Sequence, residues 1–324
     1  MIHVYTNNIA KHINTEVILQ ARVLNIQKMR SQHNGEYYQI RLADWFGETI
    51  GYVWSGCTAF DLIETIDAQD MPCVEVSGRV NRLNQQSSIR ITGLYLINAG
   101  HTQNGALLIP RASTPKVAIS AMSWLVQFID AIDNLALRNF LSSILLDTDI
   151  GIPFIQSRAC DNNHHAYPGG LLVHSIEVAR LVEINGLQLG LSADEILISQ
   201  VAALLHDLGK VHTVGDCNPR PMPTKLFRHE VQTIHLISPY LTKLNEVAPV
   251  QAWTLTHLLD RFIGSKGTYH SLFIGEDLVH YADCLSAAND VRKGLSDFIK
   301  QGQYCSMHPN NGQTHDPMYL EFSA

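Results

Sequence analysis

The chain has 324 residues, of which 46% are hydrophobic, so it can form two ordinary domains with buried cores. Its formal net charge of −7 argues against a protein that binds nucleic acid through a strongly basic surface overall. The six cysteines are far apart and form no CxxC pair, which argues against a disulfide framework or a structural zinc site. The N-terminal residues are unlike a signal peptide, and no apolar run reaches the about 18 residues of a membrane span. We therefore expect a cytoplasmic protein that does not enter the membrane.

The first hundred residues alternate between apolar and polar side chains in five segments, which lie at residues 17–23, 37–42, 50–54, 74–80 and 89–92. An Asn-Gly pair at residues 34–35 and a glycine at position 47 separate the first three segments, as expected for antiparallel strands. Five strands in about 100 residues suit a small barrel, and the OB-fold is a five-stranded candidate. Residues 61–69 lie between the third and fourth strands, where OB-folds often carry a helix.

The rest of the chain has a different pattern. Residues 99–117 contain Gly, Pro, Ser and Thr without a clear period, which predicts a linker between the barrel at 1–98 and a helical region. Helical periodicity extends over residues 118–300, and residues 301–324 form a polar C-terminal tail. The predicted fold class is therefore a multidomain α and β protein, with an N-terminal five-stranded OB-like β-barrel and a C-terminal all-α domain.

Sixteen histidines are a large share for this chain and call for a search for metal ligands. Residues 192–210 predict a largely buried helix, which begins with a Ser-x-x-Glu capping box and carries His206 and Asp207 in its last turn. Burying an adjacent imidazole and carboxylate is costly, and a bound metal ion would offset that cost. A neutral histidine hydrogen-bonded to its neighbour is the alternative.

Two further apolar helices carry a ligand candidate each, His174 in LLVHSIEVARLVE and Asp283 in EDLVHYADCLSAANDV. Two imidazoles and two carboxylates from three helices could form one octahedral site. Mixed nitrogen and oxygen ligation favours Mn, Fe, Ni or Zn over Mg, so we expect a divalent transition metal as the cofactor.

The order His174, His206-Asp207, Asp283 resembles the HD superfamily of metal-dependent phosphohydrolases, over about residues 160–290 and most clearly in LLHDLGK. The stretch HHAYPGGLLVHSIEVA at 164–179 is similar to the HD domains of YhaM-type 3′–5′ exoribonucleases and of TraI/MobH-type relaxases. ADCLSAANDV at 282–291 looks closest to the relaxases, whereas a barrel followed by an HD domain resembles the YhaM type. The resemblance implies an all-α HD domain at 118–300, with His174, His206, Asp207 and Asp283 as metal ligands.

In two-metal members of this superfamily, the aspartate at the Asp207 position would bridge two ions, and further histidines would hold the second. His229 is the first candidate for that role and His257 is the other. The related nucleases tend to carry a His-His pair where this chain has Arg261 and Phe262. The sequence therefore leaves open whether one ion binds or two.

Besides Asp207, two residues near the predicted site are candidates for catalysis. Lys210 follows the His-Asp doublet closely and could stabilise charge on a phosphoryl group, although a cation at a helix C-terminus is equally well explained by the helix dipole. His164 and His165 precede a Gly-rich turn at the predicted mouth of the site, and we take His165 as the candidate that contacts phosphate or protonates a leaving oxygen. A turn histidine satisfied by backbone is the alternative.

If apolar residues of the barrel strands face its core, then Tyr37, Arg41, Arg79 and Arg90 face outward. An aromatic ring beside arginines suits single-stranded nucleic acid, through base stacking and phosphate contacts, although an ordinary solvated face is the alternative. We therefore expect a YhaM-like phosphodiesterase that trims single-stranded RNA, or DNA, from the 3′ end. The alternatives are an HD nucleotide phosphohydrolase and a non-catalytic, relaxase-like nucleic-acid-binding protein, and a homo-oligomer is left open.

Overall fold

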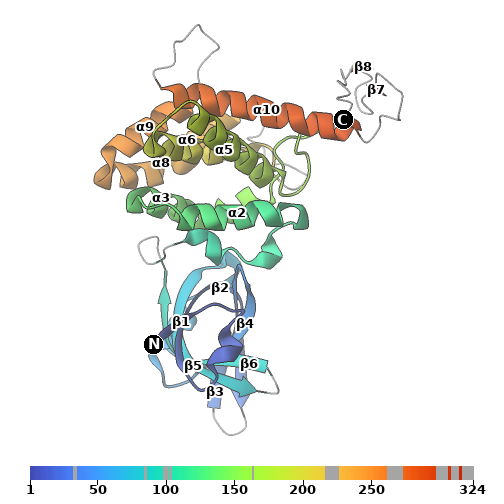
Figure 1. Ribbon diagram of the computed structural model, residues 1–324. Coiled ribbons are helices and arrows are strands. Elements are labelled where there is room, and N and C mark those ends of the chain that lie inside the picture. Colours follow the sequence, from blue (N-terminus) through green and yellow to red (C-terminus); the bar gives the residue numbers. More distant parts are fainter. Residues whose placement is uncertain are drawn as a thin grey trace.

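The computed structural model describes residues 1–31, 35–83, 86–97, 102, 104–162, 164–215, 226–260, 273–296, 306–307 and 314–315. The barrel lies at one end of the molecule and most of the helices at the other, with α2 (Ile119–Asp130) and α3 (Leu135–Leu146) between them (Figure 1). The predicted fold class is confirmed, because a closed five-stranded barrel precedes a helical region.

The barrel is built from β2 (Glu16–Ser31), β3 (Gly35–Asp44), β4 (Gly47–Trp54), β5 (Cys73–Leu83) and β6 (Gln86–Leu96), with the short β1 (Ile2–Val4) added at one edge. The strand order is β1-β2-β3-β4-β6-β5, and a further pairing of β2 with β5 closes the barrel. The predicted alternation is confirmed in the core, where Val17, Leu19, Ile40 and Leu42 are fully buried.

The alternation of side chains predicted an antiparallel sheet, but two of its strand pairs are parallel. β4 and β6 run parallel, with Ile50 opposite Ser88 and Val53 opposite Ile91, and β1 is parallel to β2. The reason is the connection, because the chain passes through α1 (Thr58–Ile63), η2 (Ala68–Asp70) and β5 before it returns as β6. Alternation of side chains fixes which face is buried but carries no information about strand direction.

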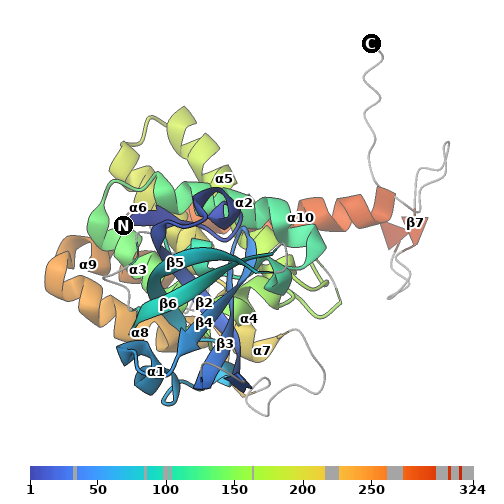
Figure 2. The ribbon, with the colours of Figure 1, turned by 90° about the horizontal axis from the view of Figure 1, so that it is seen from below.

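Residues between the barrel and the helices form three short 3-10 helices, η4 (Gly105–Leu108), η5 (Arg111–Ser113) and η6 (Lys116–Ala118). The helices that come after α2 and α3 are α4 (Gly151–Gln156), α5 (Gly170–Gln188), α6 (Ala193–Leu205), α7 (Lys210–Thr213), α8 (His229–Val247), α9 (Pro249–Asp260) and α10 (Ile274–Ser296). Viewed from below, α10 projects beyond the other helices (Figure 2). The described part of the predicted tail consists of β7 (Ser306–Met307) and β8 (Thr314–His315).

Local signals explain where several helices begin. Ser192 and Glu195 form the expected reciprocal capping box at the start of α6, and the Asn134 side chain accepts a hydrogen bond from Leu137 N–H at the start of α3. The described helices are all too short or too polar to cross a membrane.

A buried arginine joins the barrel to the helical region. Arg22 lies on β2, its side chain has no exposed surface, and its guanidinium donates to five acceptors. Two of them are the carbonyl oxygens of Leu145 and Leu146 in the last turn of α3, at 2.9 and 3.0 Å. A cation is favourable there because the last carbonyls of a helix carry partial negative charge. Trp45, in the turn between β3 and β4, is also buried in the core of the helical region.

We predict that Arg22→Met lowers the free energy of unfolding by at least about 3 kcal/mol, because each buried carbonyl left without a donor costs about 1–3 kcal/mol. Chemical denaturation followed by tryptophan fluorescence measures this. Arg30→Met is the matched control, since Arg30 is an exposed residue of the same strand. Equal stabilities of the two variants would contradict a role for Arg22 in joining the two parts.

Candidate functional site

Four potential ligands converge where α5, α6 and α10 meet. One ligand atom each from His174, His206, Asp207 and Asp283 lies within 4.8 Å of the other three. His174 Nε2 is 3.0 Å from Asp283 Oδ1 and 3.4 Å from Asp207 Oδ2, and His206 Nε2 is 3.3 Å from the same Asp207 oxygen. The structure therefore brings together the four residues that the sequence analysis named as ligands of the first ion.

Two close backbone approaches position these side chains. α5 begins at Gly170, directly after Pro168-Gly169, and a Cβ on Gly170 would collide with the carbonyl oxygen of His165. At the end of α6, Gly209 N–H donates to Thr233 Oγ1 of α8 at 2.8 Å, and a Cβ on Gly209 would collide with the carbonyl oxygen of His229. Only glycine allows these contacts, which hold the ligand-bearing ends of the helices together.

The site holds two carboxylates in a largely buried environment. Burial alone would raise the pKa values of Asp207 and Asp283, but the neighbouring histidines lower them, and Lys210 contributes at Asp207, so both pKa values lie below their usual range. Burial would lower the pKa of His206, but the two carboxylates outweigh burial and raise it. Both carboxylates therefore stay ionised, and the space between the ligands attracts a cation.

The donor atoms fit a divalent transition metal. His206 Nδ1 lies 2.7 Å from the carbonyl oxygen of Ala203, which can only accept, so Nδ1 carries a proton, and an ion would bind at Nε2 in place of the second proton of this imidazole. His174 Nε2 is buried and makes no hydrogen bond to any residue that the structure describes. Two imidazole nitrogens and two carboxylates form the mixed donor set that favours a first-row transition metal.

Lys210 and His229 contact the two oxygens of Asp207. Lys210 Nζ donates to Oδ2 at 2.5 Å, and burial lowers the pKa of Lys210 less than Asp207 raises it. His229 Nε2, at the start of α8, lies 3.1 Å from Oδ1. Oδ2 of Asp207 thus faces His174 and His206, and Oδ1 faces His229. This is the arrangement expected for a carboxylate that bridges two ions.

His257 is not among the clustered ligands of the described chain. Its Nε2 contacts Glu276 at the start of α10, and its ring lies edge-on to Phe273. The buried carboxylate of Glu276 is the polar partner of the His257 ring, so the structure gives His257 a partner other than an ion. Arg261 and Phe262, which bear on the second ion, lie outside the described residues.

The predicted placement of His165 at the mouth of the site needs correction. His165 has no exposed surface, and its Nε2 lies 3.3 Å from Glu177 and 3.8 Å from Asp290, behind the cluster. A group so enclosed cannot reach a substrate. His164 is the better placed of the pair, because it is only half-buried, whereas the fully buried His165 ring lies equally close to His174, with ring centroids 5.2 Å apart against 5.7 Å for His164. Burial lowers the pKa of His164, and Lys210 adds to this effect.

On the barrel, the structure groups Tyr37 with two aromatic residues that the sequence analysis did not select. Trp54 and Tyr52 of β4 lie 4.6 and 6.0 Å from the Tyr37 ring. Arg90 is the cross-strand neighbour of Tyr52. The signal was present in the alternation, since Tyr52 and Trp54 have the outward parity of their strand once Val53 is assigned to the core.

The three predicted barrel arginines differ in their surroundings. Arg79 and Arg90 are exposed and directly opposite each other on β5 and β6. Arg41 pairs with Glu48 at 2.7 Å, so its charge is partly neutralised. Two like charges held side by side favour an anion between them, whereas the charge of Arg41 already has a carboxylate partner.

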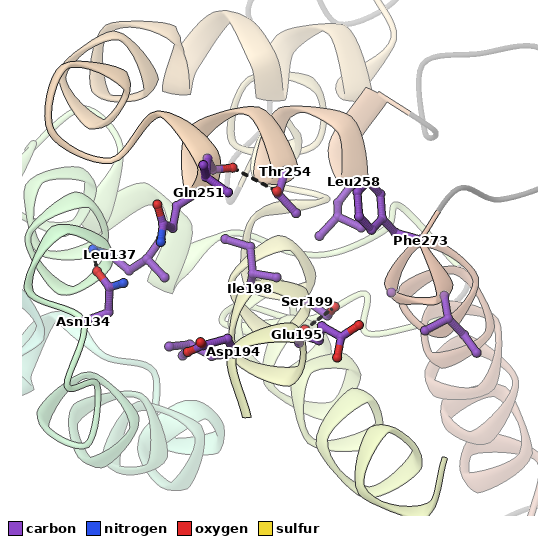
Figure 3. A pocket seen from close by; sticks show the side chains of 14 residues that line it. Asn134, Leu137, Asp194, Glu195, Ile198, Ser199, Gln251, Thr254, Leu258 and Phe273 are labelled. Atoms are coloured by element: carbon purple, nitrogen blue, oxygen red, sulfur yellow. Dashed lines mark hydrogen bonds between the residues drawn. The ribbon is translucent and has the colours of Figure 1, made fainter. Parts of the chain in front are cut away.

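A separate pocket of about 280 Å³ lies between α6, α9 and the start of α10 (Figure 3). Ile198, Leu258 and Phe273 line it, and the Ser199 and Thr254 hydroxyls bond back to carbonyl oxygens of their own helices. Ser199 is seven residues before His206, which corresponds to about 10 Å along a helix. This pocket offers apolar surface without a cluster of described ligand atoms, so we place the chemistry at the four-residue cluster.

Comparison with known proteins agrees with this placement. Residues 171–288 match the family model described as the HD domain, and the match includes all four clustered ligands. These residues form an HD domain. HD domains hold divalent metals, so the match implies a metal-dependent phosphohydrolase in general terms. No curated protein sequence matches the chain.

Three solved structures are similar to parts of the chain. An OBody bound to hen egg-white lysozyme is 17% identical, covers 29% of this chain and 90% of its own, and has a TM-score of 0.25. The second OB-fold domain of replication protein A from Methanococcus maripaludis is 18% identical, with 26% and 86% covered and a TM-score of 0.21. Aspartyl tRNA synthetase from Entamoeba histolytica is 10% identical, with 58% and 37% covered and a TM-score of 0.26.

We predict that His206→Ala and Asp207→Ala each lose bound transition metal and melt at a lower temperature than the wild type. Each variant removes a ligand, and the protein loses the stability that binding of an ion to the folded state provides. Elemental analysis of protein purified without chelator measures the metal, and calorimetry measures the melting temperature. His235→Ala, at an exposed position of α8, is the control. Wild-type protein that contains no metal would contradict the assignment.

Proposed function

We propose that this protein is a metal-dependent phosphodiesterase that removes nucleotides from the 3′ end of single-stranded RNA. The observation that carries the proposal is the convergence of His174, His206, Asp207 and Asp283 within 4.8 Å inside the HD domain. An ion held there supplies Lewis acidity toward a phosphate oxygen and makes bound water a stronger nucleophile.

The residues around the cluster have distinct roles in this proposal. Asp207 holds its two oxygens toward His174 and toward His229, so it could hold one ion on each side, and a scissile phosphate would bind to those ions and not to the carboxylate itself. Lys210, held against Asp207, stabilises the negative charge that develops on the phosphoryl oxygens. His164 is half-buried beside His174 and replaces the fully buried His165 as the candidate for contact with the leaving oxygen.

The barrel supports a polymeric substrate. Tyr37, Tyr52 and Trp54 form a group of rings on which bases can stack, and Arg79 and Arg90 supply phosphate contacts on the neighbouring strands. Arg22 and Trp45 fix the barrel against the helices, so a strand bound on the barrel keeps one orientation relative to the HD domain.

A non-catalytic nucleic-acid-binding protein is the second candidate. The contact of His257 with Glu276 favours it, because this histidine is then not available for a second ion. A one-ion site would lack one of the two clamps on the reacting oxygens and would be slower than a two-ion site.

We predict that, with Mn²⁺ added, the protein hydrolyses single-stranded RNA from its 3′ end to mononucleotides. The products should disappear with EDTA and with Asp207→Ala, because both remove the ion. End-labelled RNA resolved on a sequencing gel measures the reaction, and His235→Ala serves as the matched control. Equal background cleavage by wild type and Asp207→Ala, with oligonucleotide binding retained, would reject the enzyme and favour the second candidate.

We also predict that Trp54→Ala weakens binding of single-stranded RNA by about 5–160-fold, since loss of one base–aromatic stack costs about 1–3 kcal/mol. Fluorescence anisotropy with a labelled oligonucleotide measures the change. Tyr95→Ala is the control, because Tyr95 is an exposed ring of β6 outside the described ring contacts. If the Tyr95 and Trp54 variants bind alike at several salt concentrations, the ring group is not the binding surface.

A further inference from the structure

A chain of hydrogen bonds runs behind the metal cluster, from α5 to α10 and back. His174 Nδ1, on the side of the ring away from the cluster, lies 3.1 Å from Ser286 Oγ. Ser286 Oγ in turn donates to Glu177 Oε2 at 2.8 Å. Glu177 follows His174 by three residues and Ser286 follows Asp283 by three, so each partner lies on the same face of its helix as a ligand.

The chemistry of these groups fixes the direction of each hydrogen bond. A carboxylate can only accept, so the single proton of the Ser286 hydroxyl is given to Glu177. The Ser286 oxygen must then accept from His174, which places the proton of a neutral His174 on Nδ1. The lone pair of Nε2 therefore points at Asp207 and Asp283, as a metal ligand requires.

Glu177 is itself held from the other side. His165 Nε2 lies 3.3 Å from Glu177 Oε2, and the backbone N–H of His165 donates to Asp290 Oδ2 of α10 at 2.6 Å. His165 adopts a left-handed backbone conformation with φ of +49°, which is costly for a residue with a side chain. Such a conformation in a fully buried residue indicates that the surrounding contacts require it.

We propose that Ser286 and Glu177 are positioning residues of the metal centre, which hold His174 in the tautomer that ligates through Nε2. His165 and Asp290 keep Glu177 in place and so link the Gly-rich turn before α5 to the same centre. This inference rests on the metal-dependent function proposed above. It also gives the fully buried His165 a role that does not require contact with substrate.

Metal affinity is the direct test. Competition between the full-length protein and a chelator for Mn²⁺ should show about 10–100-fold weaker binding for Ser286→Ala, the usual effect of losing a hydrogen-bond partner of a metal-ligating histidine. Ser286→Thr keeps the hydroxyl and should bind nearly as the wild type does. Ser199→Ala is the matched control, because Ser199 is also buried on a ligand-bearing helix but bonds only to its own backbone among the described residues.

A second measurement reports the tautomer directly. In the zinc-loaded protein, nitrogen-15 NMR should show a slowly exchanging proton on His174 Nδ1, which exchanges faster with solvent in Ser286→Ala. Glu177→Gln should also weaken binding, because a side-chain amide can donate to Ser286 and turn its hydroxyl proton toward His174. This isosteric variant carries the test if Ser286→Ala fails to fold.

The outcomes separate this inference from the proposed function. Wild-type affinity for Mn²⁺ in both Ser286→Ala and Glu177→Gln would overturn the positioning role while leaving the metal centre intact. Equal losses in Ser286→Ala and Ser199→Ala would overturn it as well, since the effect would then be one of general packing. Wild-type protein without affinity for Mn²⁺ would overturn the proposed function, and the inference with it.

Discussion

The arrangement of the helices around the site depends on one buried negative charge, the carboxylate of Asp207, which needs positive charge beside it. Asp207 is 3% exposed, and its charge would be very costly without cations around it. His206 and Lys210 supply positive charge beside Oδ2, and His229 Nε2 contacts Oδ1, so burial of Asp207 requires the end of α6, α7 and the start of α8 to meet at one point. A divalent ion bound between the four ligands would complete this charge balance, and under the proposed function it would also bind a phosphate ester.

Two buried contacts hold the barrel in a fixed position against the helical region. Arg22 donates to the last turn of α3, and Trp45 is inserted into the helical core. The barrel is therefore fixed to the HD domain through α2 and α3 (Figure 1). Under the proposed function, a strand held on the rings of β3 and β4 would keep one orientation relative to the HD domain.

The sequence identified the four residues that the structure brings together, because ionisable residues in otherwise apolar helices are rare enough to stand out. The sequence did not predict on which side of the site each histidine lies. His164 and His165 are adjacent, and only the left-handed turn at His165 decides which ring is buried. The contact of His257 with Glu276 joins two helices and has no local signature. The parallel pairing of β4 with β6 likewise depends on the path of the chain and not on residue alternation.

The central claim is that one ion binds between the nitrogen atoms of His174 and His206 and the oxygen atoms of Asp207 and Asp283. Anomalous diffraction from crystals grown with Mn²⁺, recorded at the manganese absorption edge, tests this most directly. The account predicts a peak bounded by these four side chains, with His174 coordinating through Nε2. No peak at this position in a manganese-saturated crystal, or a peak coordinated by other residues, would contradict it.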